Sequence, residues 1–295
     1  MQEPVIKSKE IIAQASKDIP AALGEDLEAL ILVGSFARGE GIEGISDIEL
    51  WAVVRDIARA RSQQIPRKDI SIGFTTRRHL SRLKPYIYTL EAKKYGKVLW
   101  GDSNILSLIP DYRFEGISAY DGFILFYNRL IEQLILYEKI EKAEDIPAYY
   151  FNKGYLQLVN ALLVFHRQYR PLYAEKINAF LNLPLGGLEG LKQKAAASFN
   201  EIKAGPWRIL KQEEAASAWL ELRAYFEEVH KKARDYAPSW QDKAGDWLRA
   251  LRKGNFAPQP RYLIYRRAAR VYFSEGYKDA YKRRQVIADW ERFVK

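Results

Sequence analysis

Apolar and polar residues follow two different patterns along this chain, and the pattern changes near residue 110. Before that point, short apolar or alternating runs, which predict strands, are interspersed with helical periods. The strand-like runs cover residues 29–33, 47–54, 69–74 and 98–100, and the helical runs cover residues 5–19 and 77–83. Residues 1–110 are therefore expected to form a small mixed sheet flanked by helices.

After Pro110 the apolar residues recur at steps of three and four, which is the spacing of one face of a helix. One expected helix begins at Pro147 and runs through Phe165. Residues 111–295 are therefore expected to form a helical bundle, and the predicted fold class is α+β. A cleft between the two domains is the expected substrate site.

The first predicted strand ends in a glycine. Leu30 to Val33 is an apolar run, and Gly34 interrupts it where the backbone must turn tightly or approach a ligand. Ser35 begins a short segment that could open a helix, whose first amides suit a phosphate. Gly34 and Ser35 are therefore candidate phosphate-binding residues. Arg38 could also reach a phosphate, with an ion pair to a nearby glutamate as the alternative.

Two carboxylates follow on the next predicted strand. Asp47 and Glu49 alternate with Ile48 and Leu50, so the carboxylates point one way and the aliphatic side chains point into the core. Two like charges held side by side are costly unless a cation lies between them. Mg²⁺ takes oxygen ligands and bridges protein carboxylates to substrate phosphates. The pair therefore indicates a divalent metal site.

A third carboxylate is expected from Asp69, at the start of the alternating segment 69–74. This segment could pair beside the preceding strand and direct Asp69 into the same space. The alternative is a salt-bridged strand entry, because Arg67 and Lys68 precede Asp69. With Asp69 included, three carboxylates would complete a two-metal site.

The segments Leu32-Val33-Gly34-Ser35 and Asp47-Ile48-Glu49-Leu50 together resemble the motif of the nucleotidyltransferase superfamily typified by DNA polymerase beta. That motif is an apolar residue, Gly, Gly or Ser, a spacer of this size, and then Asp-apolar-Asp/Glu-apolar. The order of parts is similar to that of the aminoglycoside and the minimal nucleotidyltransferases. The resemblance covers residues 28–102.

The resemblance implies a Mg²⁺-dependent enzyme that transfers a nucleoside monophosphate from an NTP to an acceptor hydroxyl and releases pyrophosphate. ATP is the expected donor. Asp47, Glu49 and Asp69 would be the catalytic residues and hold two Mg²⁺ ions, or Asp69 would accept the proton of the acceptor. Gly34 and Ser35 would bind the β- and γ-phosphates. The motif names the donor chemistry and leaves the acceptor open.

The positive charge is concentrated at the C-terminal end. The formal net charge is +10, and residues 247–295 contain 13 basic and 4 acidic residues, a net +9. Aromatic residues are interleaved with these cations, which is compatible with phosphate contacts and base stacking in RNA or DNA binding. The alternative is an amphipathic helix with a solvated basic face and a buried aromatic face. The second functional hypothesis is therefore a nucleic-acid-binding module with a vestigial nucleotide site.

Composition excludes several other classes of protein. The 295 residues include no Cys, which removes disulfides and thiolate metal sites, and the 3 His residues have no metal-ligand spacing. No apolar run reaches the length of a membrane span, and the N-terminus lacks a signal-peptide pattern. A soluble cytoplasmic protein without a zinc site is expected.

Overall fold

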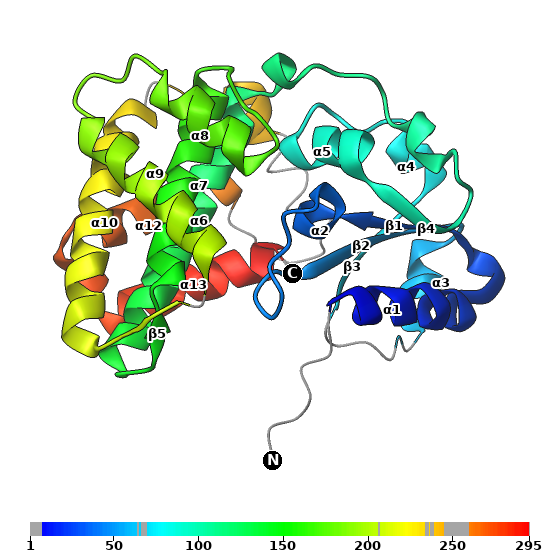
Figure 1. Ribbon diagram of the computed structural model, residues 1–295, viewed down its shortest axis with the longest axis horizontal. Coiled ribbons are helices and arrows are strands. Elements are labelled where there is room, and N and C mark those ends of the chain that lie inside the picture. The colour runs from blue at the N-terminus through cyan, green and yellow to red at the C-terminus, as the bar shows by residue number, and fades with distance from the viewer. Residues whose placement is uncertain are drawn as a thin grey trace. The chain divides into compact units, whose positions relative to one another are not determined.

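The four predicted strands pair into one mixed sheet in the computed structural model (Figure 1). The strand order is β3-β2-β1-β4, in which β1 runs antiparallel to β2 and β4, and β3 runs parallel to β2. The bounds are Leu27–Val33 for β1, Ile48–Val54 for β2, Ile70–Thr75 for β3 and Lys97–Gly101 for β4. Each strand lies within two residues of its predicted range.

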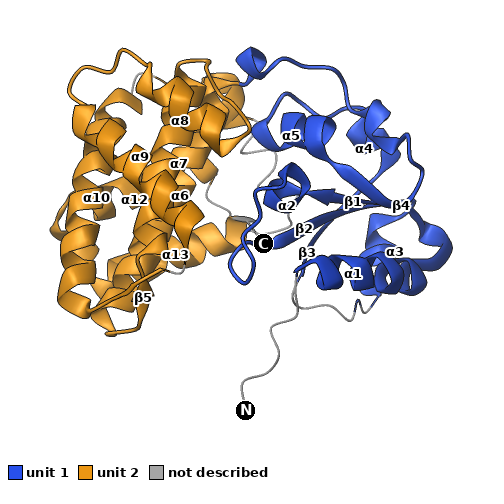
Figure 2. Ribbon diagram, viewed as in Figure 1, with its two compact units in different colours: residues 1–117 blue, residues 118–295 orange. Residues whose placement is uncertain are grey.

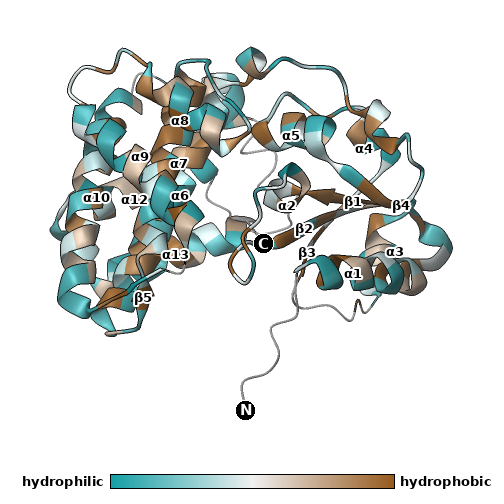
Figure 3. Ribbon diagram, viewed as in Figure 1, coloured by the Kyte–Doolittle hydropathy of each residue, from teal (hydrophilic) through white to brown (hydrophobic). Residues whose placement is uncertain are grey.

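Helices cover both faces of this sheet because its central strands are apolar on both sides. Figure 3 shows β1 and β2 mainly in the brown of apolar residues. On one face, Leu30 and Leu32 pack with residues of α1 (Ser8–Leu23) and α3 (Ile57–Ser62). On the other face, Ile31 and Val33 pack with residues of α4 (Arg77–Leu80) and α5 (Ile87–Tyr95).

Two of these helices differ from the predicted ranges, and two were not predicted. The helix α1 extends to Leu23 rather than to residue 19, and α4 ends at Leu80 rather than at residue 83. The helices α3 and α5 lie in segments for which the sequence pattern gave no helix. The predicted start of the first helix, at residue 5, lies outside the described residues.

The chain divides into two compact units, residues 1–117 and residues 118–295 (Figure 2). The second unit is mainly helical, so the chain belongs to the mixed α+β class, as predicted. The structure describes residues 8–63, 65, 70–205, 207–233, 236, 239–244 and 260–294.

The helices of the second unit surround one large apolar core, which includes the fully buried Trp219. The indole of Trp219 donates to the Gln133 carbonyl over 2.9 Å. The helices described in full are α6 (Ala119–Glu141), α7 (Tyr149–Phe165), α8 (Tyr173–Leu181), α9 (Glu189–Ala204), α10 (Gln212–Ala233), α12 (Arg261–Phe273) and α13 (Ala280–Val294).

A short antiparallel ladder in the second unit was not predicted. It pairs β5 (Ile146–Pro147) with β6 (Ile209–Leu210). Pro147 therefore lies in a strand, and the helix predicted to begin there begins at Tyr149. Proline is tolerated in a strand where its missing N–H is not needed for the ladder.

Candidate functional site

The predicted turn at Gly34 is present and depends on glycine. Val33 ends β1, and Gly34 begins the short helix α2 (Gly34–Arg38) with a positive φ of 70°. A Cβ on Gly34 would lie 2.0 Å from Oε2 of Glu49 and 3.0 Å from its Cδ. The absence of a side chain at Gly34 therefore leaves the space that the Glu49 carboxylate occupies.

The expected alternation along β2 is confirmed. Ile48 and Leu50 are 3% and 1% exposed and belong to the core under α1 and α3. Asp47, which directly precedes β2, and Glu49 within it are both exposed. Glu49 is opposite Val33 in the ladder, which explains its closeness to Gly34. The fold thus places two carboxylates on one side of the chain, at the start of β2 and beside the turn between β1 and α2.

The third predicted carboxylate, Asp69, lies outside the described residues. The next residue, Ile70, pairs with Ile48 in the parallel ladder between β3 and β2. Pairing of the segment after Asp69 with the strand after Asp47 was predicted, and this register confirms it. The participation of Asp69 in a metal site stays a prediction.

The loop between α2 and β2 is held by hydrogen bonds at both ends. At its start, the Ser35 carbonyl accepts from the Glu40 amide over 2.9 Å. At its end, Ser46 closes a turn with Ile42, since its amide donates to the Ile42 carbonyl and its Oγ accepts from the Ile42 amide, each over 2.9 Å. These contacts fix the loop between the predicted phosphate-binding residue Ser35 and the first carboxylate.

Arg38 forms an ion-pair network, so the ion-pair alternative is confirmed, although the pairing is buried. Its Nε lies 3.2 Å from Glu40 Oε2, and one terminal nitrogen lies 2.5 Å from Glu91 Oε2. Only 8% of the Arg38 side chain is exposed. Glu43 instead accepts from the Ser8 amide over 2.7 Å. Two carboxylates engage the guanidinium of Arg38, and its role in phosphate binding stays a prediction.

Sequence reasoning missed an aromatic cluster on the same face of the sheet as Glu49. Trp51 contacts Tyr88 edge to face, with 6.0 Å between ring centroids, and Tyr88 stacks on Tyr86 at 5.5 Å. The signal for Trp51 was available, because it lies two residues after Glu49 on an alternating strand. No local signal could have placed Tyr86 and Tyr88, which come from the start of α5.

Four of the eight aromatic side chains that the structure describes in the basic C-terminal segment are buried, and three more are partly buried. Tyr265 and Tyr272 are fully buried, and Tyr277 and Phe293 are 5% and 6% exposed. Tyr281, by contrast, is 71% exposed. Rings in a protein core cannot stack on bases, so these residues fit the amphipathic-helix alternative. Phe256, another aromatic residue of the segment, lies outside the described residues.

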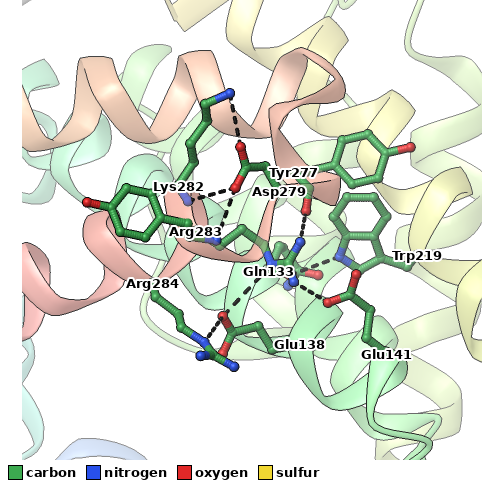
Figure 4. A network of polar contacts seen from close by, with 10 residues as sticks. Gln133, Glu138, Glu141, Trp219, Tyr277, Asp279, Lys282, Arg283 and Arg284 are labelled. Carbon is green, nitrogen blue, oxygen red and sulfur yellow. Dashed lines mark hydrogen bonds and ion pairs between the residues drawn. The ribbon is translucent and has the colours of Figure 1, made fainter.

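One cation of this segment, Arg283, is also buried, with a side chain only 1% exposed. It donates to the Tyr277 carbonyl and to the Glu141 carboxylate (Figure 4). Its guanidinium carbon lies 5.1 Å from the Tyr137 ring centroid. Arg283 therefore anchors α13 to α6 within the second unit. Arg284, the next residue, has a side chain that is 71% exposed.

No metal centre is present among the described side chains. No group of three or more His, Asp or Glu residues in the described ranges could hold a metal ion. The predicted set of three carboxylates includes Asp69, which lies outside the described residues. Carboxylate oxygens at Asp47 and Glu49 are nevertheless the ligand type that Mg²⁺ takes.

No known family model matches the chain, and no curated protein matches it in sequence. Within the part of the chain that the structure describes, no helix combines the length and the apolar composition needed to cross a membrane.

Proposed function

We propose that this protein is a Mg²⁺-dependent nucleotidyltransferase that moves a nucleoside monophosphate from an NTP to an acceptor hydroxyl. The observation that carries the proposal is the contact between Glu49 and Gly34. A glycine turn after a buried strand lies directly against a carboxylate of the neighbouring strand, and Asp47 precedes that strand on the same side. This arrangement brings together a backbone that a phosphate can approach closely and oxygen ligands for a hard cation.

Each residue has a separate task in the proposed reaction. The backbone at Gly34 and Ser35 would receive the β- and γ-phosphates, and Asp47 and Glu49 would hold the metal. Bound Mg²⁺ supplies neutralisation of phosphate charge and orientation of the reacting groups. The acceptor oxygen would form a bond to the α-phosphorus while the bond from that phosphorus to the bridging oxygen breaks. Pyrophosphate would leave, and the acceptor proton would pass to a carboxylate, for which Asp69 is the candidate.

The experiment is calorimetric titration of the full chain with each NTP, with and without Mg²⁺. We expect metal-dependent binding, with ATP as the expected donor, and its loss in the double variant Asp47→Asn/Glu49→Gln. The matched control is Glu10→Gln/Glu25→Gln, which removes the same charge at two exposed positions of the first unit. Retained metal-dependent binding in Asp47→Asn/Glu49→Gln would overturn the proposal, because the carboxylates would then have no part in it.

The alternative, a nucleic-acid-binding module with a vestigial nucleotide site, is tested in parallel. Its support in the structure is a set of exposed cations that include Arg266, Arg270 and Arg284. Salt-dependent binding of RNA or DNA, without NTP binding, would favour the module over the enzyme. The buried rings of the segment reduce the surface available for base stacking.

A further inference from the structure

The aromatic cluster continues the candidate site along β2. Trp51 lies two residues after Glu49 on the same face, about 6.5 Å further along the strand. In the ladder with β3, Glu49 is opposite Ser71 and Trp51 is opposite Gly73. A Cβ on Gly73 would lie 3.4 Å from Trp51 Cδ1, so the edge of the indole lies close to the exposed Gly73. On this face of β2, a carboxylate at Glu49 is therefore followed at the next position by an aromatic ring at Trp51.

Two tyrosines enlarge the ring surface beside Trp51. Tyr88 contacts the indole edge to face at an interplanar angle of 75°, and Tyr86 stacks on Tyr88 at 22°. Tyr88 is 50% exposed although it contacts two other rings. An exposed ring held by two neighbours offers apolar surface whose position is already fixed, at little entropic cost to a ligand.

The buried ion pair of Arg38 connects this cluster to the glycine turn. Arg38 ends α2, which begins at Gly34, and its partner Glu91 is on α5. Glu91 follows Tyr88 by three residues, so the two side chains share one side of the helix. The Arg38–Glu91 pair therefore fixes the distance between the turn and the aromatic cluster.

We infer that the cluster of Trp51, Tyr86 and Tyr88 binds the base of the donor nucleotide by stacking. The inference rests on the proposed function, because it takes the phosphates to lie at the Gly34–Glu49 contact. In a nucleotide, one ribose separates the base from the α-phosphate. In this protein, Trp51 lies two residues, about 6.5 Å, from the Glu49 carboxylate along the strand, which leaves room for that ribose. Every base has a π-face, so this surface would bind purines and pyrimidines without strict selection among them.

The test uses the full chain and two ligands in the presence of Mg²⁺: ATP and inorganic tripolyphosphate, which has the phosphates without a base. We expect Tyr88→Ala to weaken ATP binding by a factor of about 5 to about 150, the affinity that one base–aromatic stack contributes. Tripolyphosphate binding should be unchanged in that variant, and Tyr88→Phe should bind ATP as the wild type does. The matched control is Tyr281→Ala, at a ring of the second unit that is 71% exposed.

The outcomes separate this inference from the proposed function. If Tyr88→Ala binds ATP as tightly as the wild type, the base does not stack there, while the phosphate site stands. If Tyr88→Ala weakens both ligands equally, the residue acts on the phosphate site, and the stacking assignment is wrong. If Tyr281→Ala weakens ATP binding selectively, the base stacks on the C-terminal segment instead. If the wild type binds neither ligand, the proposed function fails, and this inference fails with it.

Discussion

Replacing Gly34 with alanine should destabilise the first unit through two separable effects. The first is the backbone conformation, because φ at Gly34 is +70°, and an L-residue in the left-handed region costs about 1 to 2 kcal/mol. The second is steric, since the new Cβ would lie 2.0 Å from Glu49 Oε2. Glu49 is exposed, so its carboxylate can move away into a less favoured rotamer, which costs about 0.5 to 1.5 kcal/mol. The expected total loss in the free energy of unfolding is therefore about 1.5 to 3.5 kcal/mol.

Gly39 provides the matched control for this substitution. It terminates the same helix with φ +77°, but a Cβ there would meet nothing within 4 Å. Gly39→Ala should therefore show only the conformational cost. The double variant Gly34→Ala/Glu49→Ala removes the carboxylate that the new Cβ meets, and its coupling energy isolates the steric part.

The assay is native-state hydrogen exchange of the β1 and β2 amides at increasing urea concentration. This measurement reports the opening of the sheet itself rather than the unfolding of the second unit. We expect Gly34→Ala to lower the opening free energy by at least about 0.5 kcal/mol more than Gly39→Ala does. Equal losses in the two variants would refute the reasoning, because the contact with Glu49 would then have no energetic effect.

Three other predictions concern charged or titratable groups. Arg283→Ala should lower the free energy of unfolding, measured by urea denaturation, by about 3 kcal/mol. The control Arg284→Ala should change it by less than about 0.5 kcal/mol. Similar losses in the two variants would contradict the anchoring role of Arg283. Arg38→Ala should cost about 3 kcal/mol by removing the guanidinium beside Glu91, and unchanged stability together with lost ATP binding would instead assign Arg38 to the phosphates. Burial, and then the charge of Lys232, lowers the pKa of His166 below its usual 6.5. The stability that depends on neutral His166 is therefore present above pH 6.5 and lost as the pH falls through the folded-state pKa; His166→Gln should flatten this part of a denaturation series between about pH 7.5 and about pH 5.

Elements with a strong local pattern were predictable from the sequence, and elements that depend on distant partners were not. The four strands of the main sheet have apolar runs or alternation, and these patterns can be detected in the sequence without knowing which strands pair. The ladder between β5 and β6 pairs Ile146 with Leu210, and strands of two residues have no periodicity to detect. The helix α3 was missed although a local signal is present. Asp56 caps this helix by accepting from the Ala58 and Arg59 amides.

The same distinction between local patterns and distant partners applies to the candidate site. The turn at Gly34 and the exposed carboxylates Asp47 and Glu49 follow from residues adjacent in sequence. One partner of Arg38, Glu40, is two residues away and was within reach of the sequence, but the other, Glu91, is 53 residues away and was not. Sequence alternation could place Trp51 beside Glu49, but only the packing of α5 on the sheet brings Tyr88 to Trp51.

All four strands of the main sheet lie within residues 1–117, and this has a consequence for synthesis of the protein. The ribosome adds about 5 to 20 residues per second, and N-terminal domains generally fold first. The 178 residues of the second unit, 118–295, would therefore take about 9 to 36 s to follow. During that interval β1 can already pair with β2 and β4, and Glu49 can reach Gly34. A nascent chain arrested after the first unit has left the exit tunnel should thus be able to hold the candidate site in assembled form before α6 is made.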